Sequence, residues 1–161
     1  MDSFVLDQLC ITSLSRRTLV LLQPYSTYST MLHRIHHIAI ICSDYPKSKY
    51  FYTEVLGLKP IREVYRAERN SFKLDLSLNG QYIIELFSFP NPPNRPSRPE
   101  AVGLRHLAFE VEQLEPILAQ LQEHGVVAEP IRTDEHTGCR FTFLADPDGL
   151  PIELYERNPQ Q

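Results

Sequence analysis

The amino-acid sequence predicts an α+β fold in which two similar modules, each running strand, helix, strand, strand, strand, form one domain. Three observations predict this fold. The same order of apolar patterns occurs twice, in about residues 32–90 and again in about residues 103–157. A turn signal precedes the last strand of each copy. The segment between the copies, from Pro90 to Gly103, holds five of the thirteen prolines and is typical of a stiff linker.

The first module opens with His36–Cys42, a short and mostly apolar run that is consistent with a buried strand. A helix is expected next, because Asp44 can cap it, Pro46 suits its first turn and Gly57 can end it. Three strand-like stretches complete the module, at residues 62–66, 72–78 and 81–89. Asn79-Gly80 joins the last two and is the strongest short signal of a hairpin.

The second module repeats this order. Residues 104–111 predict a strand, and apolar residues from Leu114 to Leu121 have the spacing of a one-sided helix that Gly125 can close. Three further strands are predicted at residues 126–132, 140–145 and 150–155. The sequence Asp146-Pro147-Asp148-Gly149 predicts the turn before the last of them.

Residues 1–30 differ from the domain at 31–161, since they show no sustained period and end in a Ser/Thr/Tyr-rich run. We interpret them as a non-essential extension. The alternative is an organelle address, because Arg16 and Arg17 precede a short apolar stretch. Asp2 and Asp7, however, occupy places where such a peptide is basic.

Composition excludes several classes of partner. The 161 residues include 16 basic and 20 acidic side chains, a formal charge of -4, so we expect neither a nucleic acid nor a membrane as partner. No apolar run approaches the roughly 18 residues of a transmembrane helix. The three cysteines are odd in number and widely spaced, which favours a reduced, cytoplasmic compartment over a disulfide framework.

Two histidines and two glutamates occupy matched places in the repeat. His37 and His106 lie in the first strands, and Glu85 and Glu153 in the last strands, at intervals of 85 − 37 = 48 and 153 − 106 = 47 residues. A lone strand histidine is more often a hydrogen-bonded core residue, and a strand glutamate often faces solvent. Four such residues at equivalent places favour a metal site, because a carboxylate inside an apolar strand needs a partner. Zn, Ni, Co, Mn and Fe(II) all accept such ligands.

Motifs around these four residues have a characteristic order and spacing over residues 32–157. They are His36-His37-Ile38-Ala39-Ile40, Tyr50-Phe51-Tyr52 to Leu56-Gly57, Ile84-Glu85-Leu86, His106-Leu107-Ala108-Phe109, and Asp146-Pro147-Asp148-Gly149 to Ile152-Glu153-Leu154. In this order the sequence resembles the vicinal oxygen chelate superfamily. Within it, the sequence is most similar to small bacterial proteins of the glyoxalase I (lactoylglutathione lyase) type.

The resemblance implies paired βαβββ modules that form a curved mixed sheet around a metal cleft. It implies one divalent ion, Zn or Ni first and Co, Mn or Fe as alternatives, held by His37, Glu85, His106 and Glu153. It also implies a homodimer that completes the site across its interface. His37 is preferred to His36 because the family places this ligand seven residues before the Asp that begins the helix, here Asp44.

The chemistry implied is that of a metal-dependent lyase or isomerase acting on a small oxygen-chelating carbonyl compound through a metal-stabilised enediolate. Glu153 would be the catalytic base and Glu85 the other ligand or a second base, and these roles could be exchanged. Two alternatives stay open: a non-catalytic, resistance-type protein that binds a metal or a small molecule, and an Fe(II) dioxygenase on the same scaffold.

Two departures argue against the glutathione conjugate as substrate. Glyoxalase I-like enzymes have an arginine where this sequence has Ile41, and an asparagine where it has Phe89. Because an anionic substrate needs a cationic partner, arginines near the cleft are candidates, with Arg140 preferred and Arg66 second.

Overall fold

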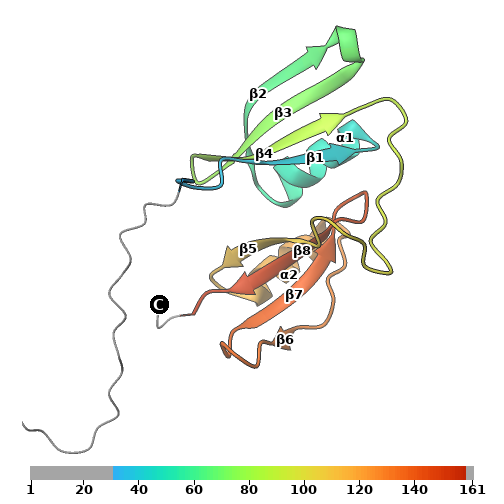
Figure 1. The fold of residues 1–161 in the computed structure, drawn as a ribbon. Helices are drawn as coiled ribbons and strands as arrows, with labels where there is room; N and C mark the ends of the chain where they lie inside the picture. Colours follow the sequence, from blue (N-terminus) through green and yellow to red (C-terminus); the bar gives the residue numbers. More distant parts are fainter. Residues whose placement is uncertain (1–30, 159–161) are drawn as a thin grey trace, which may run out of the picture. The chain divides into compact units, whose positions relative to one another are not determined.

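Two four-stranded mixed sheets make up the part of the chain that the computed structural model describes, residues 31–158 (Figure 1). The strands are β1 (Ile38–Cys42), β2 (Lys59–Arg66), β3 (Ser71–Leu78), β4 (Gln81–Ser88), β5 (Leu107–Val111), β6 (Arg132–Thr133), β7 (Arg140–Ala145) and β8 (Pro151–Glu156). Their order is β1-β4-β3-β2 in one sheet and β5-β8-β7-β6 in the other. The second sheet therefore repeats the first, which confirms the predicted α+β fold. The predicted extension, residues 1–30, lies outside the described residues.

Helix α1 (Tyr45–Tyr50) begins where the sequence predicts. The Asp44 side chain accepts a hydrogen bond from the Lys47 backbone N–H at 3.1 Å, which satisfies a donor at the helix start. The helix continues as a π-helical turn, Phe51–Val55, in place of the regular helix that the sequence predicts, and Gly57 follows with φ 74°. A short 3₁₀ turn, Ala67–Arg69, connects β2 to β3.

Each sheet places its first strand parallel to its last. In the first sheet β1 is parallel to β4, while the pairs β4–β3 and β3–β2 are antiparallel. In the second sheet β5 is parallel to β8, and β8–β7 and β7–β6 are antiparallel. The predicted hairpin turns at Asn79 and Gly80, whose φ angles of 50° and 77° suit a two-residue loop.

The second module departs from prediction at one strand. The sequence predicts a strand over residues 126–132, but β6 contains only Arg132 and Thr133. Pro130 lacks the N–H that a strand needs, so regular pairing is interrupted there. Glu129 keeps isolated contacts with β7: its N–H donates to the Phe143 carbonyl and its carbonyl accepts from the Thr142 hydroxyl, both at 2.7 Å. Helix α2 (Leu114–Glu123) has the one-sided apolar face that the sequence predicts.

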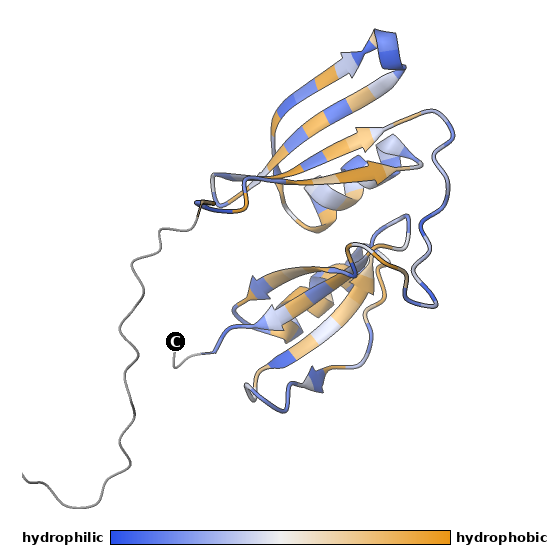
Figure 2. Ribbon diagram, in the orientation of Figure 1, coloured by the Kyte–Doolittle hydropathy of each residue, from blue (hydrophilic) through white to orange (hydrophobic). Residues whose placement is uncertain are grey.

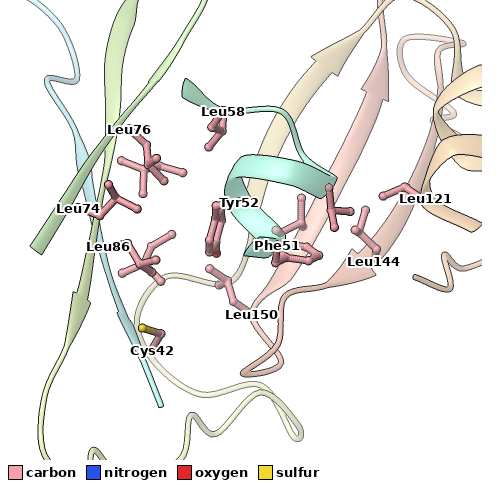
Figure 3. Packing of buried hydrophobic residues seen from close by; sticks show 14 of the residues in the cluster. Cys42, Phe51, Tyr52, Leu58, Leu74, Leu76, Leu86, Leu121, Leu144 and Leu150 are labelled. Atoms are coloured by element: carbon pink, nitrogen blue, oxygen red, sulfur yellow. The ribbon is translucent and has the colours of Figure 1, made fainter. Parts of the chain in front are cut away.

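The core lies on the helix-covered faces of the two sheets. Apolar residues alternate with polar ones along β3 and β4, as the bands of Figure 2 show. Leu74, Leu76 and Leu86 are fully buried and face the ring of Tyr52 (Figure 3). The opposite face of the first sheet carries Lys73 and Glu85, the second of which is an expected metal ligand. Within residues 31–158, no helix is long and apolar enough to cross a membrane.

Candidate metal centre

The first histidine–glutamate pair lies at the start of the first sheet. His37 immediately precedes β1, and Glu85 lies in β4 opposite Ala39. His37 is two residues before Ala39, and side chains two residues apart on a strand share a face. His37 therefore points to the same side of the sheet as Glu85, the partner of Ala39. The His37 Nε2 atom lies 3.3 Å from Glu85 Oε2.

The second module repeats this arrangement. His106 immediately precedes β5, and Glu153 lies in β8 opposite Ala108. The His106 Nε2 atom lies 3.0 Å from Glu153 Oε2. The two pairs thus have the same register in their sheets. This shared register explains why the two histidines precede their glutamates by similar intervals, 48 and 47 residues.

One chain presents the expected ligands as two pairs. Across residues 31–158, no group of three or more His, Cys, Asp or Glu side chains is placed to hold one ion. Each pair is set by the parallel pairing inside its own sheet, and no strand of one sheet is hydrogen-bonded to a strand of the other. The register of the strands therefore places each histidine beside its own glutamate.

The geometry distinguishes His37 from its neighbour His36. The Nδ1 atoms of the two rings are 2.8 Å apart, and the His36 ring meets Tyr82 edge-on with centroids 5.2 Å apart. His37 instead stacks on the Tyr82 ring at 5.3 Å and directs Nε2 toward Glu85. This supports the choice of His37 over His36.

Sequence reasoning missed a charged network around Glu85. The Lys73 ammonium lies 2.5 Å from Glu85 Oε1 and 2.5 Å from Asp75 Oδ1. The Tyr82 hydroxyl donates to both carboxylates. Burial raises the pKa of Glu85, but the hydrogen bonds from Lys73 and Tyr82 outweigh it and hold the pKa below its ordinary value. Alternation along β3, in which Leu74 and Leu76 are buried and Lys73 is not, is the signal that could have found this network.

The first pair, His37 and Glu85, and the second pair, His106 and Glu153, are the two half-sites. An aromatic residue lies beside the second half-site where a charged residue lies beside the first. Phe143 lies opposite Glu153 in the sheet, the place that Asp75 takes opposite Glu85. The ring of Phe143 meets His106 edge-on at 5.3 Å. A pocket of about 690 Å³ opens here, lined by His106, Glu153, Phe141, Phe143, Arg105 and Arg132, among others. This volume suits a small-molecule ligand.

The two predicted substrate arginines lie on different faces of their sheets. Arg140 donates to Glu115 at the start of α2 and to Glu156 in β8. Thr142, two residues further on, shares the face of Arg140 by alternation, whereas Phe143 lies opposite Glu153, so Arg140 lies on the face opposite Glu153. We correct the expectation for Arg140 accordingly: this arginine connects helix to sheet.

Arg66, the second choice, lies on the face that carries Glu85. It pairs with Ser71 across β2 and β3, and its guanidinium lies over the rings of Phe87 and Phe89. Ile41 is exposed and lies opposite Phe87 on the same face. Glyoxalase I-like enzymes have polar residues at two of these positions. Here one position is Ile41, which is apolar and exposed, and the other is Phe89, whose ring lies beneath the Arg66 guanidinium.

The residues of the two pairs fit a divalent ion. Imidazole nitrogens and carboxylate oxygens are suitable ligands for Zn, Ni, Co, Mn and Fe(II). Two atoms that each bind one ion at about 2 Å lie about 3 Å apart, and the His–Glu separations of 3.3 and 3.0 Å agree with that spacing. In each module His Nε2 and the nearer carboxylate oxygen face each other, as two ligands of one ion do.

Comparison with known proteins gives strong matches. Residues 34–154 match the family model described as Glyoxalase/Bleomycin resistance protein/Dioxygenase superfamily. The chain is 65% identical over 127 residues to the uncharacterized protein YwkD of Bacillus subtilis (strain 168), covering 79% of this chain and 99% of that protein. It is 60% identical over 126 residues to the uncharacterized protein YaeR of Escherichia coli (strain K12), covering 78% and 98%. The crystal structure of a glyoxalase family protein from Enterococcus faecalis matches with a TM-score of 0.71 and 52% identity, over 76% of this chain and 97% of that chain.

Two more distant relatives have names that state an activity. Lactoylglutathione lyase of Schizosaccharomyces pombe (strain 972 / ATCC 24843) is 29% identical over 155 residues, covering 83% of this chain and 50% of that protein. Catechol-2,3-dioxygenase of Bacillus subtilis (strain 168) is 27% identical over 138 residues, covering 81% and 45%. The two named reactions differ, so the family match does not show which reaction this chain catalyses.

Proposed function

Because the chain belongs to the glyoxalase/bleomycin resistance protein/dioxygenase superfamily, we propose that it is a divalent-metal-dependent lyase or isomerase of the glyoxalase I type. Its substrate is a small carbonyl compound that binds a metal through neighbouring oxygens. Zn or Ni is the first choice of ion, with Co, Mn and Fe as alternatives. The observation that carries the proposal is the pair of matched His–Glu contacts, His37–Glu85 and His106–Glu153.

The two glutamates take different roles in this proposal. When bound, the ion polarises the substrate oxygens and acidifies the adjacent C–H bond. Glu153 then takes the proton, because among the described residues only His106 forms an ion pair with its carboxylate. Glu85 is tied by Lys73 and Tyr82 as well as by His37, so it is suited to stay in place as a ligand. This asymmetry favours Glu153 as the base, although the sequence alone left the roles exchangeable.

A homodimer would complete the site. A chain that presents its ligands as two separate pairs needs a second copy to bring four together, with His37 and Glu85 of one copy facing His106 and Glu153 of the other. Cyclic twofold symmetry makes two such sites at once, since the same interface is used by both copies. The pocket beside His106 and Glu153 leaves room for the substrate.

Free cysteines support a cytoplasmic location for this enzyme. Cys42 is buried, and burial raises the pKa of its thiol to about 11, so it behaves as a packed apolar residue. Within residues 31–158, Cys139 also forms no disulfide. Unpaired thiols are typical of a reducing compartment.

Metal binding tests the site directly. We expect metal-free protein to bind Zn and Ni in calorimetric titrations, and we expect Glu85→Gln and His106→Ala each to weaken binding by at least about tenfold. His136→Ala is the matched control, because His136 lies in an exposed turn apart from both pairs. Unchanged stoichiometry and affinity in both ligand variants would remove the proposed centre.

Turnover then tests the reaction. Protein loaded in turn with Ni and Zn, with metal content measured on the same sample, is assayed without oxygen on the methylglyoxal–glutathione hemithioacetal and on small α-hydroxycarbonyl compounds. Metal-dependent isomerisation of any of them supports the proposal. Tight binding without product would favour the resistance-type binder instead, and a need for Fe(II) with oxygen uptake would favour a dioxygenase.

A further inference from the structure

Arg66 is held rigidly on the face of the first sheet that bears Glu85. Its Nε and Nη2 atoms both donate to the Ser71 hydroxyl, at 3.1 and 2.6 Å. Ser71 is fully buried, so the hydroxyl that receives these bonds is itself fixed. Arg66 and Ser71 are partners in the register of β2 and β3, which makes this contact a consequence of strand pairing.

Two aromatic rings support the same guanidinium. The Arg66 Cζ atom lies 4.8 Å from the centre of the Phe87 ring and 5.5 Å from that of Phe89. The two rings stack on each other, with centroids 5.9 Å apart and an angle of 16° between their planes. A guanidinium held this way loses little further entropy when it binds a ligand.

The charge of Arg66 is not neutralised by a carboxylate. Among the described residues none of the ion pairs within 4.0 Å includes Arg66, and its bonds to Ser71 use two of its five N–H donors. Two other cations of this face are paired: Arg62 with Asp75 at 2.8 Å, and Lys73 with Asp75 and Glu85. These two cations share the two carboxylates, and Arg66 pairs with neither of them.

The second module supplies an internal comparison. Arg132 lies over Phe141 and Phe143 at 5.0 and 5.3 Å, much as Arg66 lies over its two rings. Arg132 differs in one respect, since its Nη2 atom donates to Glu129 at 2.9 Å. The arginine–aromatic arrangement therefore occurs in both modules, but among the described residues only Arg132 has a carboxylate partner, and Arg66 has none.

We propose that Arg66 binds an oxyanion on the substrate, a carboxylate, phosphate or phosphonate, while the oxygen-chelating end of the same molecule lies at Glu85. This rests on the proposed function and specifies its substrate class. Phe87 is two residues beyond Glu85, or about 7 Å along the strand, so a small molecule can reach both places. Arginine suits this task because its planar fork donates two parallel hydrogen bonds to an oxyanion.

The test uses metal-free full-length protein, so that it does not depend on the proposed metal. Inorganic phosphate, methylphosphonate and acetate are titrated in turn against uniformly ¹⁵N-labelled protein, and the Arg66 Nε–H resonance is followed by NMR. We expect a saturable shift of this resonance. Arg66→Lys keeps the charge but loses the fork, and we expect it to weaken binding, followed on Phe87 amide signals, by about tenfold.

Two further variants separate the fork from general charge. Ser71→Ala keeps Arg66 but removes its anchor, and we expect intermediate binding. Arg69→Gln removes a nearby exposed arginine and should leave binding unchanged. The ranking of phosphate, methylphosphonate and acetate identifies the oxyanion.

The proposal is overturned if no anion binds, if Arg66→Lys binds as well as the natural protein, or if Arg69→Gln lowers binding equally. Failure here together with intact Zn binding would leave the metal centre standing and remove only the anionic substrate. Anion binding without any metal binding would support the anion site at Arg66 and remove the proposed metal centre. Thermal melts of each variant confirm folding, and Ser71→Ala serves if Arg66→Lys does not fold.

Discussion

The Tyr52 hydroxyl donates a hydrogen bond to Asp146 Oδ2 across 2.9 Å, in the interior of the domain. Tyr52 belongs to the helical segment of the first module, and Asp146 to the last turn of the second. Tyr52 is 0% exposed and Asp146 is 6% exposed, so water has little access to either. Figure 3 shows the Tyr52 ring between leucines of the first sheet and Leu150 of the second module. This buried polar contact therefore links the two modules within their shared core.

Tyr52→Phe should destabilise the protein by about 1–3 kcal/mol, because the Asp146 carboxylate would lose a donor that water cannot replace. Unfolding in urea, followed by circular dichroism, measures this loss. Tyr50→Phe is the matched control: its hydroxyl contacts His124, but Tyr50 is 51% exposed, so water can replace the bond. Equal effects of the two substitutions would contradict a special role for the buried contact.

Asp146 also makes stability depend on pH. Burial raises the pKa of Asp146 above its ordinary value, despite the bonds that it accepts from Leu150 and Tyr52. Between the unfolded and folded pKa values the native state holds more protons than the unfolded state, so this group lowers stability as pH rises through that window. Asp146→Asn removes the titration, and its one carbonyl oxygen keeps an acceptor for the backbone N–H groups of Asp148 and Leu150.

We therefore expect the stability of Asp146→Asn, relative to the natural protein, to increase from pH 4 to pH 7. Urea unfolding midpoints of both proteins across that range measure the difference. Any loss of packing or hydrogen bonding in the variant is constant with pH and does not affect the trend. Parallel curves would show that Asp146 does not titrate abnormally.

Lys73 should oppose metal binding while stabilising the metal-free protein. Its ammonium lies between Asp75 and Glu85, so it neutralises Glu85 before an ion arrives and repels the ion afterwards. We expect Lys73→Met to lower metal-free stability by about 1–3 kcal/mol and to raise Zn affinity by about tenfold.

Calorimetric Zn titration and urea unfolding of the same samples check both halves of this prediction. Lys47→Met is the control, because Lys47 is exposed on α1 and its side chain lies on the helix side of the first sheet. A fall in Zn affinity would mean that the hold of Lys73 on Glu85 favours metal binding more than its charge opposes it.

Much of this site follows from the sequence because it is a local product of strand register. The repeat places His37 beside Glu85 and His106 beside Glu153, and parallel pairing makes each contact inevitable once the strands form. The shortened β6 could also have been expected, since Pro130 stands in the middle of the predicted strand.

Other features of the site depend on contacts between residues that are distant in the sequence, and the hydrophobic periodicity of the sequence does not reveal such contacts. Arg140 and Arg66 look alike in sequence, and only the faces of their strands separate the helix-bound arginine from the one beside Glu85. The contact of Lys73 with Glu85 requires β3 and β4 to pair in one register. The separation of the four ligands into two pairs depends on how whole sheets associate, which hydrophobic alternation within a strand does not specify.

Mixed dimers of two inactive chains test whether a second copy completes the metal centre. His37→Ala damages the first half-site and His106→Ala the second, so neither variant alone should bind Zn tightly. If each site joins the first module of one copy to the second module of the other, a mixed dimer contains one doubly damaged site and one intact site. Unfolding and refolding the variants together should then restore about one Zn ion per pair of chains in mixed dimers. If each chain forms its own site, every site keeps one damaged half and mixing restores nothing. Separate refolding of each variant is the control, and differently tagged chains allow the mixed dimer to be purified before its metal content is measured.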